Sequence, residues 1–297
     1  MKYDARSYGR ARHKGKLMML TGIALALMSF IVILSSLAGN GAADDKKAVK
    51  GDSAMNSSQT ENGSSSDNPV KDLRLYIDPD SNASRQAAVW RMIAPNKAKL
   101  MDTLAEQPTA RWVTSPDAVP VIGDFVNEAK SASSVPVLVA YFFPHRDCGL
   151  YSAGGAKDEE EYKEFIGGLA RAIGDTRTIV ILEPDALAQI SVTKENGEMC
   201  LNESQRNARY KLMSYAVDRL KKQPNTTVYI DAGNSKWIKP EDMAQRLEKA
   251  NVKAADGFSL NVSNFQPTDE TTDYGRAISA ETGGKHFVID TSRNGLG

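Results

Sequence analysis

Two stretches decide the fold: residues 136–149 read PVLVAYFFPHRDCG, and residues 178–185 read TIVILEPD. Each is a short apolar run that ends abruptly in charged side chains. Between them, residues 158–173 form a longer amphipathic stretch that is typical of a helix. A strand, a helix and a second strand in this order predict two parallel strands joined by a helical crossover.

The same alternation runs from residue 73 to the end of the chain and predicts an α/β fold with one parallel sheet. A (β/α) barrel is favoured over a three-layer sandwich, because no glycine-rich dinucleotide or phosphate loop follows the first strand. The predicted strands cover residues 73–77, 110–113, 136–142, 178–182, 227–230, 257–260 and 286–289. The predicted helices cover residues 84–106, 117–133, 158–173, 202–223, 240–250 and 268–282.

The end of the chain modifies this prediction. Residues 286–290 read as a strand, and residues 291–297 read as the loop that follows it. A parallel barrel that stops there lacks its closing strand and has an open edge. The sequence therefore predicts an incomplete barrel in a chain that is truncated at its C-terminus.

The composition excludes several classes of protein. The 297 residues carry 37 basic and 37 acidic side chains, and 41% of them are hydrophobic. This balance excludes collagen, a coiled coil and wholesale disorder, and the zero net charge argues against nucleic-acid binding. Two cysteines cannot form a four-ligand zinc site, and three histidines leave little for a catalytic one. We expect neither a metal nor an organic cofactor.

Residues 1–43 read as a targeting segment. Residues 1–16 are basic, and residues 17–38 are 22 positions without a charge, which is long enough to cross a bilayer as a helix. The positive-inside rule places everything after residue 40 outside the cytoplasm. A cleaved signal peptide and an uncleaved membrane anchor both remain open. We expect an extracellular protein that is either secreted or tethered to the membrane.

Residues 44–72 read as a disordered polar linker. They contain no aromatic residue and few aliphatic ones, so they cannot bury enough surface to offset the entropy of ordering. Residues 73–297 then form the folded domain.

Four predicted strands deliver a carboxylate to one edge of the sheet. Asp147, Asp185, Asp231 and Asp290 each follow the carboxyl end of a strand, and these ends form the ligand site of parallel α/β folds. Each carboxylate also has a structural interpretation as a helix cap, an ion-pair partner or a turn residue. Their clustering, with Tyr141 nearby, favours a functional site.

Such a cluster suits two kinds of chemistry: acid–base cleavage of a glycosidic bond, or the binding of a hard metal ion. In the first, one carboxyl must stay protonated so that it can donate to the leaving oxygen, and a neighbouring carboxylate raises its pKa. The order of the motifs suggests Asp185 as the donor and Asp147 as the charged neighbour. A nucleophilic serine is less well supported, because no elbow motif surrounds any serine of the domain.

Two of the three tryptophans lie where a sugar groove would run. Trp112 ends a predicted strand and Trp237 follows Asp231 by six residues, and flat aromatic surfaces pack well against pyranose rings. Burial in the core is the alternative for Trp237. Trp90 lies in a helical stretch with Val89 and other apolar residues, so we expect it in the core.

The two cysteines are Cys148, directly after Asp147, and Cys200, in the polar loop after Asp185. Both are predicted to lie outside the cytoplasm, where disulfides persist. A bond between them would pin the two loops together, and two free thiols are the alternative.

Five motifs occur in order along the chain: residues 141–155, 183–185, 231–233, 261–264 and 290–295. Together they resemble glycoside hydrolase family 6, from residue 73 to the last residue. The resemblance implies a distorted, incomplete (β/α) barrel. It also implies an endo-β-1,4-glucanase or cellobiohydrolase that inverts the anomeric configuration.

The resemblance assigns four residues to catalysis. Asp185 resembles the general acid, and Asp147 resembles the carboxylate that raises the pKa of the acid and helps to relay a proton from water. Ser152 resembles the hydroxyl that helps to hold this water. Tyr141 resembles the tyrosine that presses the reacting sugar out of its relaxed chair.

The resemblance also places residues in the glucan groove or behind the carboxylates: Trp112, Trp237, Asn264, Asp231 and Arg293. Cys148 and Cys200 match the disulfide of the family. Asn234 stands where the family usually has histidine, and it can hydrogen-bond a sugar but cannot carry a charge. The family's last strand, with a tryptophan, a lysine and a further aspartate, has no counterpart within the 297 residues.

These inferences predict an exported, monomeric glucanase that cleaves cellulose or a related β-1,4-glucan, with endo action favoured over exo action. Two alternatives remain. The first is a non-catalytic cell-surface protein that binds glucan, and the second is a metal-dependent hydrolase that uses the same acidic edge.

Overall fold

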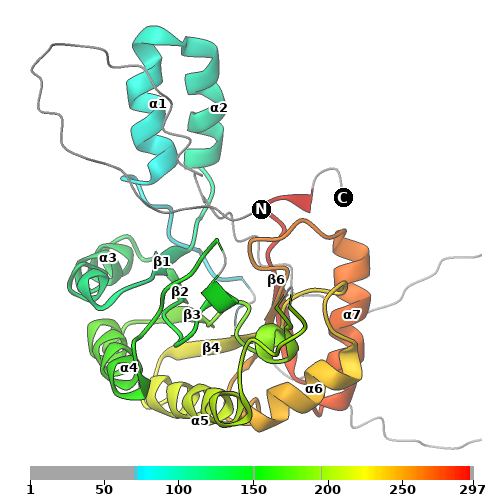
Figure 1. The fold of residues 1–297 in the computed structure, drawn as a ribbon. Coiled ribbons are helices and arrows are strands. Elements are labelled where there is room, and N and C mark those ends of the chain that lie inside the picture. Colours follow the sequence, from blue (N-terminus) through cyan, green and yellow to red (C-terminus); the bar gives the residue numbers. More distant parts are fainter. Residues whose placement is uncertain (1–69, 71, 150, 195, 295–297) are drawn as a thin grey trace, which may run out of the picture.

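A computed structural model describes residue 70 and residues 72–149, 151–194 and 196–294. The predicted targeting segment and nearly all of the predicted linker lie outside these residues. Within them, six parallel strands form one sheet in the order β1-β2-β3-β4-β5-β6, and the sheet does not close (Figure 1). The strands are β1 (Arg111–Val113), β2 (Val137–Ala140), β3 (Thr178–Leu182), β4 (Thr226–Asp231), β5 (Gly257–Leu260) and β6 (His286–Ile289).

The incomplete parallel α/β barrel is confirmed, and one of its seven expected strands is missing. Residues 73–77 make only an isolated parallel bridge, between Leu75 and Val135. Two backbone hydrogen bonds support it, from Tyr76 N–H to Val135 O and from Val135 N–H to Arg74 O. The apolar residues 73–77 do not form a strand, because they pair with the neighbouring segment at Val135 only.

Alternate residues of the inner strands face opposite sides, as a strand requires. On β3, Val180 and Leu182 pack into the large core that the helices cover, whereas Ile179 and Ile181 belong to a second core on the other face of the sheet. The same alternation holds on β2 and β4. Burial on both faces explains why these strands read as continuous apolar runs.

Five helices follow the strands and surround the sheet (Figure 1). Two of them begin at clear signals in the sequence. The side chain of Asp158 caps α4, and Asn202 with Gln205 forms a reciprocal capping box at α5. The five are α3 (Val119–Ser131), α4 (Glu159–Ile173), α5 (Glu203–Leu220), α6 (Pro240–Lys249) and α7 (Thr268–Glu281).

Residues 84–106, expected to form one helix, form two: α1 (Asn82–Ile93) and α2 (Pro95–Ala105). Pro95 lacks an N–H and forces the preceding residue away from helical geometry. Ala94 accordingly adopts φ −153° and ψ 66°. The chain turns at this point, and the two helices form an antiparallel hairpin that stands away from the sheet (Figure 1).

The expectation that Trp90 lies in the core is therefore wrong. Its ring is only partly buried, and Lys97 Nζ lies 5.8 Å from the ring centroid. The apolar neighbours of Trp90 on α1 are also exposed: Val89 by 62%, Met92 by 92% and Ile93 by 74%. Among the described helices, none combines the length and the apolar character that crossing a bilayer would need.

Candidate active site

The chain leaves the sheet through residues whose backbone is left-handed. Asp147 (φ 54°), Glu183 (φ 52°), Asp185 (φ 70°) and Asn261 (φ 60°) all follow the carboxyl ends of strands. This conformation is uncommon for residues with a side chain and costs on the order of 1 kcal/mol or more at each position. Such strain is typical of functional sites, because it aims side chains in directions that a regular strand cannot.

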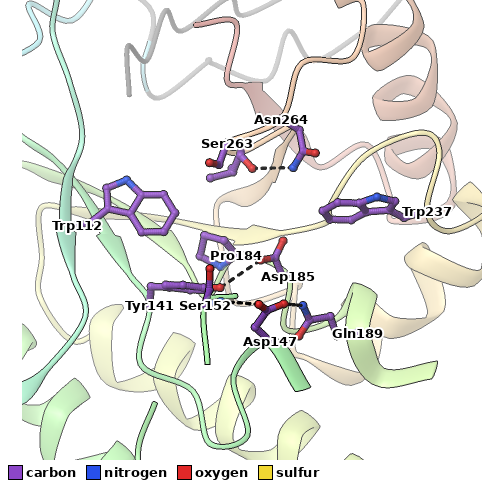
Figure 2. A pocket seen from close by; sticks show the side chains of 11 residues that line it. Trp112, Tyr141, Asp147, Ser152, Pro184, Asp185, Gln189, Trp237, Ser263 and Asn264 are labelled. Carbon is purple, nitrogen blue, oxygen red and sulfur yellow. Dashed lines mark hydrogen bonds between the residues drawn. The ribbon is translucent and has the colours of Figure 1, made fainter. Parts of the chain in front are cut away.

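A pocket of about 250 Å³ lies over this edge of the sheet. Figure 2 shows Trp112 and Trp237 on opposite sides of it, with Tyr141, Asp147 and Asp185 between them. Seven of the predicted site residues line the pocket together with four residues that were not singled out. The lining residues are Trp112, Tyr141, Asp147, Ser152, Pro184, Asp185, Gln189, Trp237, Val262, Ser263 and Asn264.

Asp185 has the environment that a proton donor needs. Burial raises the pKa of its carboxyl to about 6, the negative charge of Asp147 acts in the same direction, and a hydrogen bond from Tyr141 opposes them. Tyr141 Oη donates to Asp185 Oδ2 at 3.3 Å. With a pKa near 6, Asp185 keeps its proton through mildly acidic conditions, whereas an ordinary aspartic acid loses it near pH 4.

Asp147 is held as an acceptor on both of its oxygens. Oδ2 accepts from the backbone N–H of Ser152 at 2.7 Å, and Oδ1 accepts from Gln189 Nε2 at 3.0 Å. Two N–H donors on one carboxyl group are the arrangement that suits an ionised carboxylate. The pocket thus combines one carboxyl whose pKa is raised with one whose two oxygens both accept hydrogen bonds.

Tyr141 is fixed from the side that faces away from Asp185. The guanidinium of Arg146 lies 4.6 Å from the Tyr141 ring centroid, and Arg146 Nη1 donates to Tyr141 O at 2.6 Å. Trp112 packs edge-on against the same ring, with 5.2 Å between the ring centroids. The ring therefore has a defined position at the base of the pocket.

Asp231 and Asn234 are buried and do not line the pocket. Asp231 Oδ2 accepts from the backbone N–H groups of Asp185 and Gly233, both at 3.0 Å, and burial raises the pKa of Asp231 to about 8. Asn234 has no exposed surface, and its Oδ1 accepts from Lys236 N–H. In this conformation Asn234 belongs to the turn that leads to Trp237 and does not line the pocket.

Trp237 is 45% exposed and lines the pocket, so its placement in the core is excluded. Arg293 lies in the turn after β6, outside the residues that line the pocket. Asp290, at the end of the same strand, accepts from Ser263 N–H and Ser292 N–H and thus joins two loops.

A sequence model described as "Glycosyl hydrolases family 6" matches residues 70–297. The chain belongs to this family. Endoglucanase 1 of Streptomyces halstedii is 38% identical over 235 residues, which cover 75% of this chain and 70% of that protein. Endoglucanase A of Cellulomonas fimi is 37% identical over 227 residues, which cover 75% of this chain and 47% of that protein.

A solved family 6 structure shares the fold. It is the endoglucanase Cel6 of Mycobacterium tuberculosis in complex with a methyl-cellobiosyl-thio-cellobioside. The TM-score is 0.70 at 40% identity, and the alignment covers 77% of this chain and 76% of that one. The Humicola insolens endoglucanase CEL6B, at 22% identity and a TM-score of 0.65, supports the fold alone.

Three polar residues around this site were given no role from the sequence. Gln189 holds Asp147, as described above. Glu183 is fully buried and accepts from the backbone N–H groups of Phe142 and Phe143, next to Tyr141. Burial raises the pKa of Glu183 to about 8. A glutamate at the end of an apolar strand is the one signal that could have identified it.

Arg209 is the third of these residues, and it connects the two loops that carry the aspartates. The side chain is 2% exposed. Nη1 donates to Ala186 O at 2.9 Å, and Nη2 donates to Pro144 O at 3.1 Å. The pattern of α5 alone contains nothing that separates Arg209 from its surface arginines.

The predicted bond between Cys148 and Cys200 is present, with 5.8 Å between the Cα atoms. It joins the Asp147 loop to the segment that follows β3, so the disulfide and Arg209 hold the same two loops. Among the described residues, no group of three or more histidine, cysteine, aspartate or glutamate side chains is arranged to hold a metal ion.

We expect the double variant Cys148→Ser/Cys200→Ser to unfold at a lower temperature than the parent. The bond spans 52 residues, and a loop of this length corresponds to about 4 kcal/mol of chain entropy. Differential scanning calorimetry with and without reductant measures the effect. Melting of the parent that does not change under reducing conditions would show that the bond contributes nothing to stability.

Proposed function

We propose that this chain hydrolyses β-1,4-glucosidic bonds with inversion of configuration, and that Asp185 is the general acid. The observation that carries the proposal is the raised pKa of Asp185, about 6, in a pocket that it shares with the Asp147 carboxylate. The two tryptophans on opposite sides of the pocket supply flat surfaces for sugar rings (Figure 2). The family relatives named endoglucanase support a glucan substrate.

In this mechanism the Asp185 carboxyl donates its proton to the glycosidic oxygen as the C1–O bond breaks. Water attacks C1 from the opposite face, and its proton passes towards Asp147. Ser152 helps to hold this water, and its backbone N–H keeps Asp147 in place. Tyr141 lies next to Asp185, to which its hydroxyl donates, and presses on the sugar ring at the bond that breaks.

Endo action is the favoured form of this activity. The candidate for a roof over the groove is the segment 191–204, which is of moderate length and contains Cys200 of the disulfide. We also propose that the domain acts outside the cell, because the disulfide needs an oxidising compartment. Its partner is a β-1,4-glucan, and we propose that the domain acts as a monomer.

The test is reducing-sugar release from carboxymethylcellulose or mixed-linkage β-glucan by the full chain. We expect activity that is unchanged by EDTA. Above about pH 6 the rate should fall up to tenfold per pH unit, because Asp185 must carry its proton to act. The rate should be highest in mildly acidic buffer.

Two outcomes would contradict the proposal. Loss of activity with EDTA, restored by a divalent cation, would support a metal-dependent hydrolase. Binding of β-glucan without release of reducing ends, across the whole pH range, would support a non-catalytic glucan-binding protein.

A further inference from the structure

Gln189 is bonded to both carboxylate residues of the pocket. It lies on the short 3-10 helix η3 (Ala188–Ser191), which begins three residues after Asp185. Its backbone N–H donates to Asp185 O at 2.9 Å, and its side-chain Nε2 donates to Asp147 Oδ1 at 3.0 Å. Gln189, which lines the pocket, thus joins the loop that carries Asp147 to the loop that carries Asp185 (Figure 2).

The turn that carries Gln189 is firmly anchored. Arg246 of α6 donates from Nη1 to Leu187 O at 2.7 Å and to Ala188 O at 3.0 Å, and from Nη2 to Ser191 Oγ at 2.8 Å. The flanking Ala188 and Ile190 are buried. The backbone of η3 therefore has little freedom, and the amide of Gln189 reaches Asp147 from a fixed point.

Asp147 depends on this contact more than a residue on a strand would. Its backbone is left-handed, and its carboxylate has one other partner among the described hydrogen bonds, the N–H of Ser152 on Oδ2. Without Gln189, Oδ1 loses its donor and the carboxylate can turn away from Asp185. Because Asp147 accepts here, the amide must present its nitrogen, so the orientation of Gln189 is set by its partner.

We propose, on the basis of the function proposed above, that Gln189 is a positioning residue that keeps the Asp147 carboxylate beside Asp185 and thereby sets the upper pH limit of activity. Gln189 is neutral and touches no reacting atom in this role. Its effect passes through Asp147, whose charge disfavours the ionisation of Asp185.

The charged and titratable groups around this contact come from the loops after β2 and β3, from the end of β4, where Asp231 accepts from Asp185 N–H, and from α5 and α6. Asp147, Asp185 and Tyr141 face the pocket. Arg146 lies behind Tyr141, Arg246 binds η3 from α6, and Arg209 binds Ala186 O from α5. No described hydrogen bond joins these arginines to the Gln189 side chain, so a change of charge at position 189 acts on Asp147 and, through it, on Asp185.

Two substitutions should move the high-pH limb of the kcat profile in opposite directions. In Gln189→Leu, Asp147 is released and repels an ionised Asp185 less, so the limb should move to lower pH. In Gln189→Glu, the new carboxyl can donate to Asp147 Oδ1 while it is protonated, and it adds a second negative charge beside Asp147 once it ionises, so the limb should move to higher pH. At the pH optimum we expect kcat to fall about tenfold in both variants. The KM for cellohexaose should change less than about twofold.

Gln245 supplies matched controls. It is exposed on α6, outside the pocket, so Gln245→Leu and Gln245→Glu should leave the pH profile unchanged. Gln189→Asn retains the amide but is one methylene shorter, and it should shift the limb in the same direction as Gln189→Leu. It replaces Gln189→Leu in the test if the leucine variant fails to fold.

A high-pH limb that stays at its parent position in Gln189→Leu, Gln189→Asn and Gln189→Glu would overturn the role of Gln189. Shifts of the same sign in the leucine and glutamate variants would also overturn it, because a structural disturbance alone has no reason to follow charge. The proposed function fails separately, if Asp185→Ala retains parental turnover on the same substrate.

Discussion

Asp185→Ala is expected to lower kcat on cellulose, carboxymethylcellulose and β-glucan by about 10²–10⁴-fold. The leaving group of these substrates is a sugar hydroxyl, which departs slowly unless it is protonated as the bond breaks. Asp185 holds a proton because burial and the charge of Asp147 raise its pKa to about 6. Alanine removes the donor and leaves the tryptophan-lined pocket in place, so glucan binding should change by less than about tenfold.

The leaving group provides the sharpest control. With 2,4-dinitrophenyl β-cellobioside the leaving phenolate needs no proton, so Asp185→Ala should retain most of the parental rate on this substrate. Asp117→Ala, on an exposed aspartate outside the pocket, should behave as the parent on both substrates. Equal losses on the activated and unactivated substrates would remove Asp185 from the role of acid.

Asp147→Asn is expected to lower kcat on the same glucans about a hundredfold and to move the high-pH limb of the profile to lower pH. Asparagine has the same shape, and its side-chain oxygen can still accept the 2.7 Å hydrogen bond from Ser152 N–H. The negative charge is lost. Without it, Asp185 ionises more easily, and the attacking water loses the carboxylate towards which its proton passes.

The activated substrate separates the two aspartates. Asp147→Asn should remain slow on 2,4-dinitrophenyl β-cellobioside, because water must attack C1 of either substrate and lacks the carboxylate towards which its proton passes. Asp185→Ala should retain most of the parental rate on this substrate, because the phenolate leaves without a proton. Asp117→Asn is the matched control for the change of charge. An Asp147→Asn variant with parental turnover and an unmoved high-pH limb would show that Asp147 plays no part in the reaction.

Much of the fold could be predicted because the strands are buried on both faces and therefore read as apolar runs. Two errors have local causes. Residues 73–77 have the composition of a strand but pair only at Leu75, and pairing depends on a partner far away in sequence. The stretch 84–106 has helical periodicity throughout, but Pro95 divides it, and the hairpin that results leaves Trp90 outside the core.

Residues of the pocket could be predicted where a carboxylate follows an apolar strand. They could not be predicted where only contacts in the folded chain bring a residue to the site. Asp147 and Asp185 follow apolar strands, so a carboxylate there is conspicuous in the sequence. Gln189 and Arg209 lie in ordinary polar surroundings, and only the folded chain shows that they bind the loops that carry Asp147 and Asp185. Asn234 stands where the family usually has histidine, and only the folded chain shows that its turn buries it completely.

The positions of the tryptophans allow glucan binding to be followed by intrinsic fluorescence. The chain has three, of which Trp112 and Trp237 line the pocket and Trp90 lies on the helical hairpin. A glucan that replaces water at the two pocket rings will change the intensity and wavelength of their emission, while Trp90 contributes a constant background. A Trp90→Phe variant would remove that background, so binding to any of the inactive variants could be titrated without a label.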